Sequence, residues 1–276
     1  MGKRILPFAL NHMTAPGMPT DAFLDLATAL GCVGVEIRSD LPAALFDAKS
    51  SEHVQKITKA IGLRILTLAK VKVFKDFSDA KLDEARGLME IAVACGAEAI
   101  SLIPRNDGQA LRNGERQEIL LMALRELKPL LEAYGLIGLV EPLGFETSTL
   151  RDKSEAVDAF ETVDGAGRFR LVHDTFHHHL AGGGPLFPEH TDLVYISGVA
   201  DPGLDISDMR DEHRVLVDHR DRLKNVAQIE VFLNAGYTGP ISREAFSPSV
   251  HAFTDPKAEL SGSFDFIASR LAEMAA

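Results

Sequence analysis

Short apolar runs alternate with longer amphipathic stretches along the whole chain. Runs of this kind are typical of buried strands, whereas the stretches between them have the periodicity of helices. We count eight apolar runs, at residues 4–10, 32–37, 63–69, 97–103, 136–141, 168–174, 192–197 and 239–244. Gly31, Gly96, Gly135 and Gly236 stand shortly before four of these runs, as expected where a helix ends and the next strand begins. The repeated order predicts an α/β fold with a parallel sheet.

Eight strand–helix units in 276 residues are about 34 residues each, which is close to what a (β/α)8 barrel needs. The sequence therefore predicts a single-domain TIM barrel over residues 1–276, since no linker or low-complexity tract divides the chain. A doubly wound open sheet is the alternative. Such a sheet usually has a glycine-rich phosphate turn after its first strand, and here that segment reads NHMTAPGMP. The barrel is therefore favoured.

Three of the apolar runs end in a carboxylate: Glu141 follows GLIGLV, Asp174 follows FRLVH and Glu244 follows GPISR. A charge at the end of a buried strand is costly unless a metal, a partner or a substrate compensates it. The carboxyl ends of barrel strands form the rim on which active sites are built. We therefore expect the three carboxylates to belong to one polar site.

The composition is that of an ordinary globular protein, with 46% hydrophobic and 25% charged residues. The net charge of -11 argues against a nucleic-acid partner, because bulk electrostatics would oppose binding to a phosphate backbone. The two cysteines, Cys32 and Cys95, form no CxxC pair, which argues against a thiolate zinc site and suits a reducing cytoplasm. The N-terminal run ILPFAL is too short for a signal peptide or a membrane span. We expect a cytoplasmic protein without a membrane partner.

Six motifs occur in order along nearly the entire chain. They are ALNHM at the first strand end, CVGVEIR at the second, IPRNDG after the fourth, VEPLGFETSTLRDK after the fifth, HDTFHH after the sixth, and AGYTGPISREAFSP across the last helix and strand. Together these motifs resemble the sugar phosphate isomerase/epimerase superfamily, the xylose isomerase-like TIM barrels. Within it the chain is most similar to the inosose isomerase and dehydratase branch of inositol catabolism.

The resemblance implies a divalent metal held by a Glu, an Asp, a His and a second Glu at the ends of the fifth to eighth strands. By motif these are Glu141 of VEP, Asp174 of HDTFH and Glu244 of SREAF. Where the family usually has the histidine, this chain has Tyr195 in VYISGVAD. A neutral phenol is a poor ligand beside an imidazole.

Four interpretations of this replacement stay open. Tyr195 binds as phenolate, a water fills the position, another histidine such as His177 or His251 reaches in, or the metal is absent. Three carboxylates without an assured imidazole favour Mn²⁺ or Mg²⁺, with Zn²⁺ as the alternative.

The resemblance also implies that His177 and Arg214 bind substrate oxygens. Arg214 lies in the polar stretch from Asp201 to Asn225, which a barrel would place as a long loop on the same rim. Glu36 ends the second run as Glu141 ends the fifth, although Arg38 can simply pair with it. Further candidates for substrate binding are His12, Lys70 and Asn106, with Asn11 beside them on the rim.

The leading functional hypothesis is an isomerase or epimerase of a keto-sugar or keto-inositol that works by proton transfer through an enediolate. Glu141 and Glu244 would remove and return the proton, and the metal would stabilise the developing charge. An inosose dehydratase-type lyase is one alternative, and a metal-deficient, non-catalytic sugar-binding barrel is another. An endonuclease for abasic DNA is disfavoured by the acidic charge. The expected partner is a non-phosphorylated sugar or cyclitol, and a homo-oligomer is compatible with the sequence.

Overall fold

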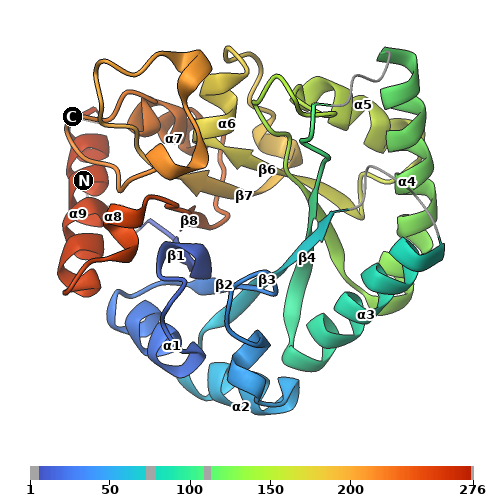
Figure 1. Ribbon diagram of the computed structural model, residues 1–276, viewed down its shortest axis with the longest axis horizontal. Coiled ribbons are helices and arrows are strands. Elements are labelled where there is room, and N and C mark those ends of the chain that lie inside the picture. Colours follow the sequence, from blue (N-terminus) through green and yellow to red (C-terminus); the bar gives the residue numbers. More distant parts are fainter. Residues whose placement is uncertain (1–5, 73–78, 109–112, 275–276) are drawn as a thin grey trace.

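The computed structural model describes residues 6–72, 79–108 and 113–274. Eight parallel strands close into a barrel in the order β1 to β8, and helices surround it (Figure 1). The strands are β1 Phe8–Asn11, β2 Gly34–Arg38, β3 Arg64–Lys72, β4 Ala97–Ile103, β5 Ile137–Val140, β6 Phe169–Asp174, β7 Thr191–Ile196 and β8 Ile241–Arg243. Each overlaps one of the eight predicted runs. The TIM barrel is confirmed, and the open-sheet alternative is wrong, because β1 pairs with both β2 and β8.

The helices lie outside the barrel and follow the strands in turn (Figure 1). They are α1 Thr20–Ala29, α2 Ser51–Ile61, α3 Asp79–Cys95, α4 Asn113–Tyr134, α5 Lys153–Thr162, α6 Thr175–Leu180, α7 Asn225–Asn234, α8 Pro248–His251 and α9 Pro256–Met274. The glycines expected between helix and strand all have positive φ, as at Gly96 with φ of 78° and Gly236 with φ of 86°, a conformation that glycine adopts without strain. Within the described residues, no helix combines the length and the apolar character needed to cross a membrane.

The inside of the barrel is filled in two layers of different character. Towards the N-terminal ends of the strands, small and medium apolar side chains form a plug, which includes Ala9, Ala99, Leu139 and Val172. The ring of Tyr195 packs on this plug, whereas polar side chains from the strand ends lie above it. The plug separates this polar layer from the N-terminal end of the barrel, where Leu66, Ala99 and Leu139 line a second cavity of about 520 Å³. Active sites of TIM barrels lie at the C-terminal rim.

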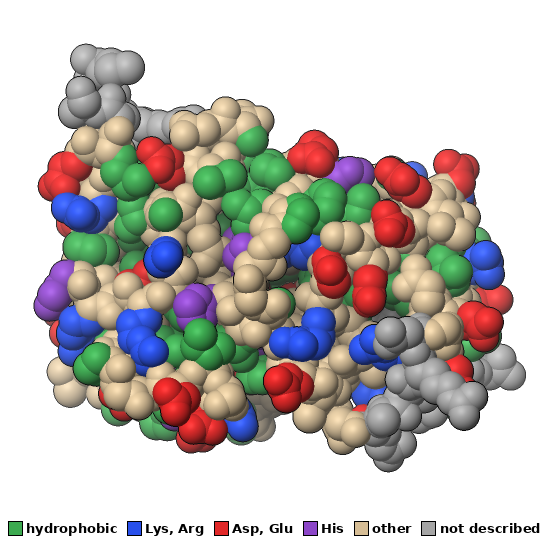
Figure 2. Space-filling view, turned by 90° about the horizontal axis from the view of Figure 1, so that it is seen from above, with side chains coloured by type: hydrophobic (Ala, Val, Ile, Leu, Met, Phe, Trp, Pro, Cys, Tyr) green, Lys and Arg blue, Asp and Glu red, His purple; other side chains and the backbone are tan. Residues whose placement is uncertain are grey.

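Charged side chains of both signs are interspersed over the face of the molecule shown in Figure 2. The net charge of the chain is -11.

Candidate active site at the C-terminal rim

A cavity of about 500 Å³ opens where the strands end. Seven of the residues predicted from the sequence line it: Lys70, Asn106, Glu141, His177, Tyr195, Arg214 and Glu244. Asp174 lies directly behind this lining, bonded to Arg214. Other polar residues that line the cavity are Arg38, Lys81, Ser101, Arg105, Asp107 and Asp211. The three strand-end carboxylates thus belong to one site, as their positions in the sequence indicated.

Arg214 is the cation at the centre of the site. It comes from the loop between β7 and α7, and its side chain is 1% exposed. Its Nη2 donates to Asp174 Oδ2 at 2.6 Å and to Glu244 Oε2 at 3.0 Å. The guanidinium also lies over the rings of Phe176 and Phe246. Burial alone would lower the pKa of Arg214, but the carboxylates of Asp174 and Glu244 raise it, so the residue stays positively charged.

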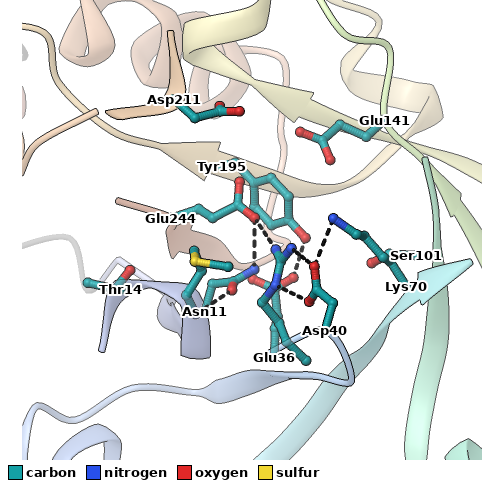
Figure 3. A network of polar contacts seen from close by, with 12 residues as sticks. Asn11, Thr14, Glu36, Asp40, Lys70, Ser101, Glu141, Tyr195, Asp211 and Glu244 are labelled. Atoms are coloured by element: carbon teal, nitrogen blue, oxygen red, sulfur yellow. Dashed lines mark hydrogen bonds and ion pairs between the residues drawn. The ribbon is translucent and has the colours of Figure 1, made fainter. Parts of the chain in front are cut away.

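A second buried arginine, Arg38 at the end of β2, holds the other side of Glu244. Its Nη1 donates to Glu244 Oε1 at 2.8 Å, while Nε and Nη2 donate to the two oxygens of Asp40 at 2.8 and 2.9 Å. Lys70 forms an ion pair with the same Asp40 at 2.8 Å. Figure 3 shows this network, in which Asn11 also donates to Glu244 Oε1. The simple interpretation that Arg38 pairs with Glu36 is wrong, because Arg38 extends to the rim carboxylates instead.

Glu36 lies one layer below the cavity and is completely buried. Its carboxyl accepts hydrogen bonds from the hydroxyls of Tyr195 and Ser242. Burial raises the pKa of Glu36 to about 8, against the lowering effect of those two donors. Burial and the neighbouring Glu36 likewise raise the pKa of Tyr195 well above its ordinary value. Tyr195 is therefore a neutral phenol whose hydroxyl donates to the Glu36 carboxyl below the cavity.

Glu141, Asp174 and His177 face one another on the side of the cavity formed by β5, β6 and α6. Each offers one ligand atom, and these atoms all lie within 4.8 Å of one another. The His177 Nε2 to Glu141 Oε1 distance is 3.7 Å. Two carboxylate oxygens and an imidazole nitrogen are a donor set that suits a divalent transition metal. The buried group can therefore hold a metal ion.

The electrostatics of these three residues differ. Burial, Glu244 and Asp174 raise the pKa of Glu141 well above its ordinary value. Burial would also raise the pKa of Asp174, but the Arg214 guanidinium and its other hydrogen-bond donors lower it. Burial lowers the pKa of His177 to about 4, so its imidazole is neutral at pH 7. Of the three strand-end carboxylates, Glu141 is the one that no guanidinium group of the described residues contacts.

Local structure fixes the position of His177. Asp174 ends β6 and caps α6, because its Oδ1 accepts from the backbone N–H groups of Phe176 and His177 at 2.7 and 3.1 Å. Gly144, in the loop after β5, lets α6 approach closely. A Cβ at this position would lie 2.1 Å from the His177 carbonyl oxygen and 2.7 Å from Leu180 Cβ. The first turn of α6 is thus held from both sides.

Besides Asp174 and Asn11, two further predicted site residues, His12 and Glu36, do not line the cavity. The His12 ring stacks on Phe23 with its centroid 4.2 Å away, and its Nε2 contacts the Met18 carbonyl oxygen. Glu36 contacts the site only through Tyr195 and Ser242, as described above. His251, an alternative metal ligand, instead contacts the Ala245 carbonyl oxygen through its ring.

Several residues of the site were not predicted. The role of Arg38 towards Glu244 was missed, as were Asp40, Asp211 and Phe246. Asp40 comes two residues after a strand that ends in Glu36 and Arg38, so its place beyond a strand end is a signal in the sequence. Asp211 lies in the predicted rim loop, but nothing in the pattern separates it from the other charges of that loop.

Residues 24–270 match the xylose isomerase-like TIM barrel family. The chain belongs to this family. A crystal structure of a xylose isomerase domain-containing protein from Salmonella typhimurium LT2 is 30% identical, with a TM-score of 0.88 and 99% of each chain covered. The family resemblance expected from the six motifs is thereby confirmed.

Two further similar proteins have names that state an activity or a bound metal. An inosose isomerase from Bacillus licheniformis is 26% identical over 175 residues, which are 62% of this chain and 62% of that protein. The chain therefore spans less than two thirds of the length of that relative. A crystal structure of IolI protein with a bound zinc atom is 20% identical to this xylose isomerase-like barrel, with a TM-score of 0.87 over 96% of this chain and 99% of that one.

The close contact at Gly144 generates a prediction about stability. Replacing Gly144 with Ala should lower the free energy of unfolding by about 2 kcal/mol or more, because the added methyl group meets backbone that cannot move aside cheaply. Gly17→Ala is the matched control, since a Cβ there meets nothing within 4 Å, and its change should stay within about 0.5 kcal/mol. Urea denaturation measures both. Equal stabilities of the two variants would contradict the contact.

The buried carboxyl of Glu36 generates a prediction about pH. Its pKa is raised from an ordinary 4.5 to about 8, so the folded protein binds a proton that the unfolded chain releases between these values. Stability should therefore fall as pH rises through this window, by up to about 5 kcal/mol for the full shift. Glu36→Gln cannot ionise and should lose less stability than wild type.

Chemical denaturation at several pH values between about 5 and 8 measures this difference. Glu118→Gln, at an exposed position on α4, serves as the control and should keep the wild-type slope. If Glu36→Gln shows the same pH dependence as wild type, Glu36 does not carry the buried proton.

Proposed function

We propose that this protein is an isomerase or epimerase that moves a proton next to the carbonyl of a keto-sugar or keto-inositol, through an enediolate. The observation that carries the proposal is the pair of buried glutamates, Glu141 and Glu244, that lines the same cavity from the ends of β5 and β8. Figure 3 shows the two carboxylates on either side of the Tyr195 ring. The similarity to an inosose isomerase supports the same class of substrate.

The two glutamates are suited to different parts of a proton transfer. Glu244 is fixed by Arg38 and Arg214, which counteract the rise in its pKa that burial causes. Glu141 has no hydrogen bond to its carboxyl among the described residues, and its pKa is raised well above the ordinary value. Pairs of carboxyls whose environments separate their pKa values can act as base and acid of one reaction. We assign Glu244 to removal of the substrate proton and Glu141 to its return.

The remaining polar groups suit the negative charge that develops in such a reaction. Arg38, Lys70 and Arg214 present their cationic groups to the cavity from β2, β3 and the β7–α7 loop. Preorganised positive charge in a site that excludes water stabilises an enediolate without further reorganisation. Ser101 and Asn106 also line the cavity and can hydrogen-bond the hydroxyl groups of a sugar or cyclitol.

A divalent metal ion belongs to the proposal. Of the carboxylates implied by the family resemblance, Glu141 and Asp174 lie in the group that can hold an ion, whereas both oxygens of Glu244 already accept from arginines. A bound divalent ion would add Lewis-acid stabilisation of the substrate oxygens. Mn²⁺ and Zn²⁺ accept both oxygen and nitrogen ligands, while Mg²⁺ prefers oxygen. We also propose that the protein acts in inositol catabolism and in the cytoplasm.

Solvent proton exchange tests the proposed reaction. Wild-type protein incubated in D₂O with a panel of ketoses and inososes should incorporate deuterium next to the carbonyl of its substrate. Glu244→Gln and Glu141→Gln should each lower the exchange or turnover rate by about 100-fold or more, because each removes one of the two proton carriers. Glu146→Gln, an exposed glutamate five residues after Glu141, is the matched control and should keep the wild-type rate.

The products separate the competing hypotheses. In parallel incubations in H₂O, an isomerase or epimerase gives a product of unchanged mass, whereas a dehydratase-type lyase gives a product lighter by one water. A sugar-binding barrel would show ligand-dependent thermal stabilisation without exchange. Exchange that persists in Glu244→Gln would remove that residue from its assigned role.

A further inference from the structure

The position where the family resemblance expects a histidine ligand is occupied by a residue that is bound elsewhere. Tyr195 ends β7 with a side chain that is 2% exposed, and its ring packs into the apolar plug of the barrel. Its hydroxyl donates to the carboxyl of Glu36, below the cavity. Binding a metal as phenolate would remove the proton that this hydroxyl donates and leave a buried carboxyl with one donor fewer, which is costly.

His177 is the histidine whose ring faces the carboxylates. Its side chain is 4% exposed, and Nε2 lies 3.7 Å from Glu141 Oε1. Its Nδ1 is buried without a hydrogen-bond partner in the part of the chain that the structure describes. The Nδ1 atoms of His12 and His173 also lack a partner there, but each of these rings has its other nitrogen in a hydrogen bond, to Met18 and Gln228. One ring nitrogen of His178 and of His251 likewise contacts Lys153 and Ala245. A buried imidazole that faces two carboxylates, with one ring nitrogen 3.7 Å from Glu141 and the other without a hydrogen bond, is placed as a metal ligand would be.

The distances allow an ion between these three residues. The ligand atoms of Glu141, Asp174 and His177 lie within 4.8 Å of one another. Two ligands on opposite sides of an ion at about 2.1 Å would lie about 4 Å apart, so only a small side-chain adjustment is needed. Glu141 can adjust, because no hydrogen bond fixes its carboxyl among the described residues. Asp174 Oδ2 accepts one hydrogen bond from Arg214 and keeps a second lone pair.

We infer that the divalent ion is bound by Glu141, Asp174 and His177, with His177 replacing the residue at the end of β7 as the nitrogen ligand. The inference rests on the proposed function, because that function gives the ion its use. It also assigns separate tasks to the two glutamates. Glu141, which returns the proton in the proposed function, also ligates the ion, whereas Glu244 lies outside the group of three and removes the proton without a metal contact.

The test measures metal binding directly. Full-length protein is freed of metal with a chelator, dialysed, and titrated with Co²⁺ by calorimetry and visible absorption. Wild type should bind one equivalent. His177→Gln should weaken binding by at least about 100-fold, since loss of a ligand costs more than the 10- to 100-fold seen for outer-shell partners. Tyr195→Phe should bind as wild type does.

Matched variants keep the test falsifiable. His178→Gln changes the next residue of α6, whose ring contacts Lys153, and should bind Co²⁺ as wild type does. His177→Cys retains a metal ligand at this position. Its Co²⁺ complex should show a thiolate-to-cobalt charge-transfer absorption that wild type lacks. This variant tests the inference even if His177→Gln fails to fold. Circular dichroism checks the fold of each variant.

Each other outcome overturns the inference. If Tyr195→Phe weakens binding and His177→Gln does not, the ligand is at the end of β7. If wild type binds no Co²⁺, the three residues do not form a metal site. The proposed function is judged separately, because proton exchange by wild type can be measured in the presence of chelator. Proton exchange without metal would support the proposed reaction and would reject only the role of the ion in it.

Discussion

The ion pairs of Arg214 with Asp174 and Glu244 are the interaction on which the site depends. All three side chains are almost completely buried, and the desolvation of such charges is offset only by close and well-directed hydrogen bonds. The same Asp174 caps α6 through its other oxygen, so one carboxylate fixes both the rim loop and the first turn of the helix. Through this residue, the position of His177 depends on the position of Arg214.

Two polar layers above the apolar plug have different tasks. The lower layer, Glu36 with Tyr195 and Ser242, is closed and neutral, because burial raises the pKa values of its acidic groups. The upper layer alternates carboxylates with arginines around an open cavity. Because the lower layer is neutral and excludes solvent, the ion pairs of the upper layer lie above surroundings of low polarity. Such surroundings strengthen electrostatic interactions. Tyr195 connects the layers, because its ring packs on the plug, it lines the cavity and its hydroxyl donates to Glu36.

The repulsion expected among the strand-end carboxylates is offset mainly by arginine side chains of the protein itself. From the sequence, three neighbouring carboxylates called for a metal cation. In the structure, Arg38 and Arg214 neutralise Glu244 and Asp174, and only Glu141 lacks a guanidinium partner among the described residues. The site therefore needs one further positive charge rather than several. That charge can come from a metal ion, from the protonation of Glu141, or from both at different stages of a reaction.

The sequence by itself determined the barrel and the strand ends that carry Glu141, Asp174 and Glu244, because the hydrophobic period and the order of the motifs are local properties of the chain. It also indicated Tyr195 as the position where the family resemblance implies a histidine. Only the tertiary structure decided that Arg38 reaches Glu244 instead of Glu36, that His12 packs on Phe23, and that His177 rather than His251 faces the carboxylates. These choices depend on distances between residues far apart in the chain, such as Arg38 and Glu244, and local patterns do not encode them.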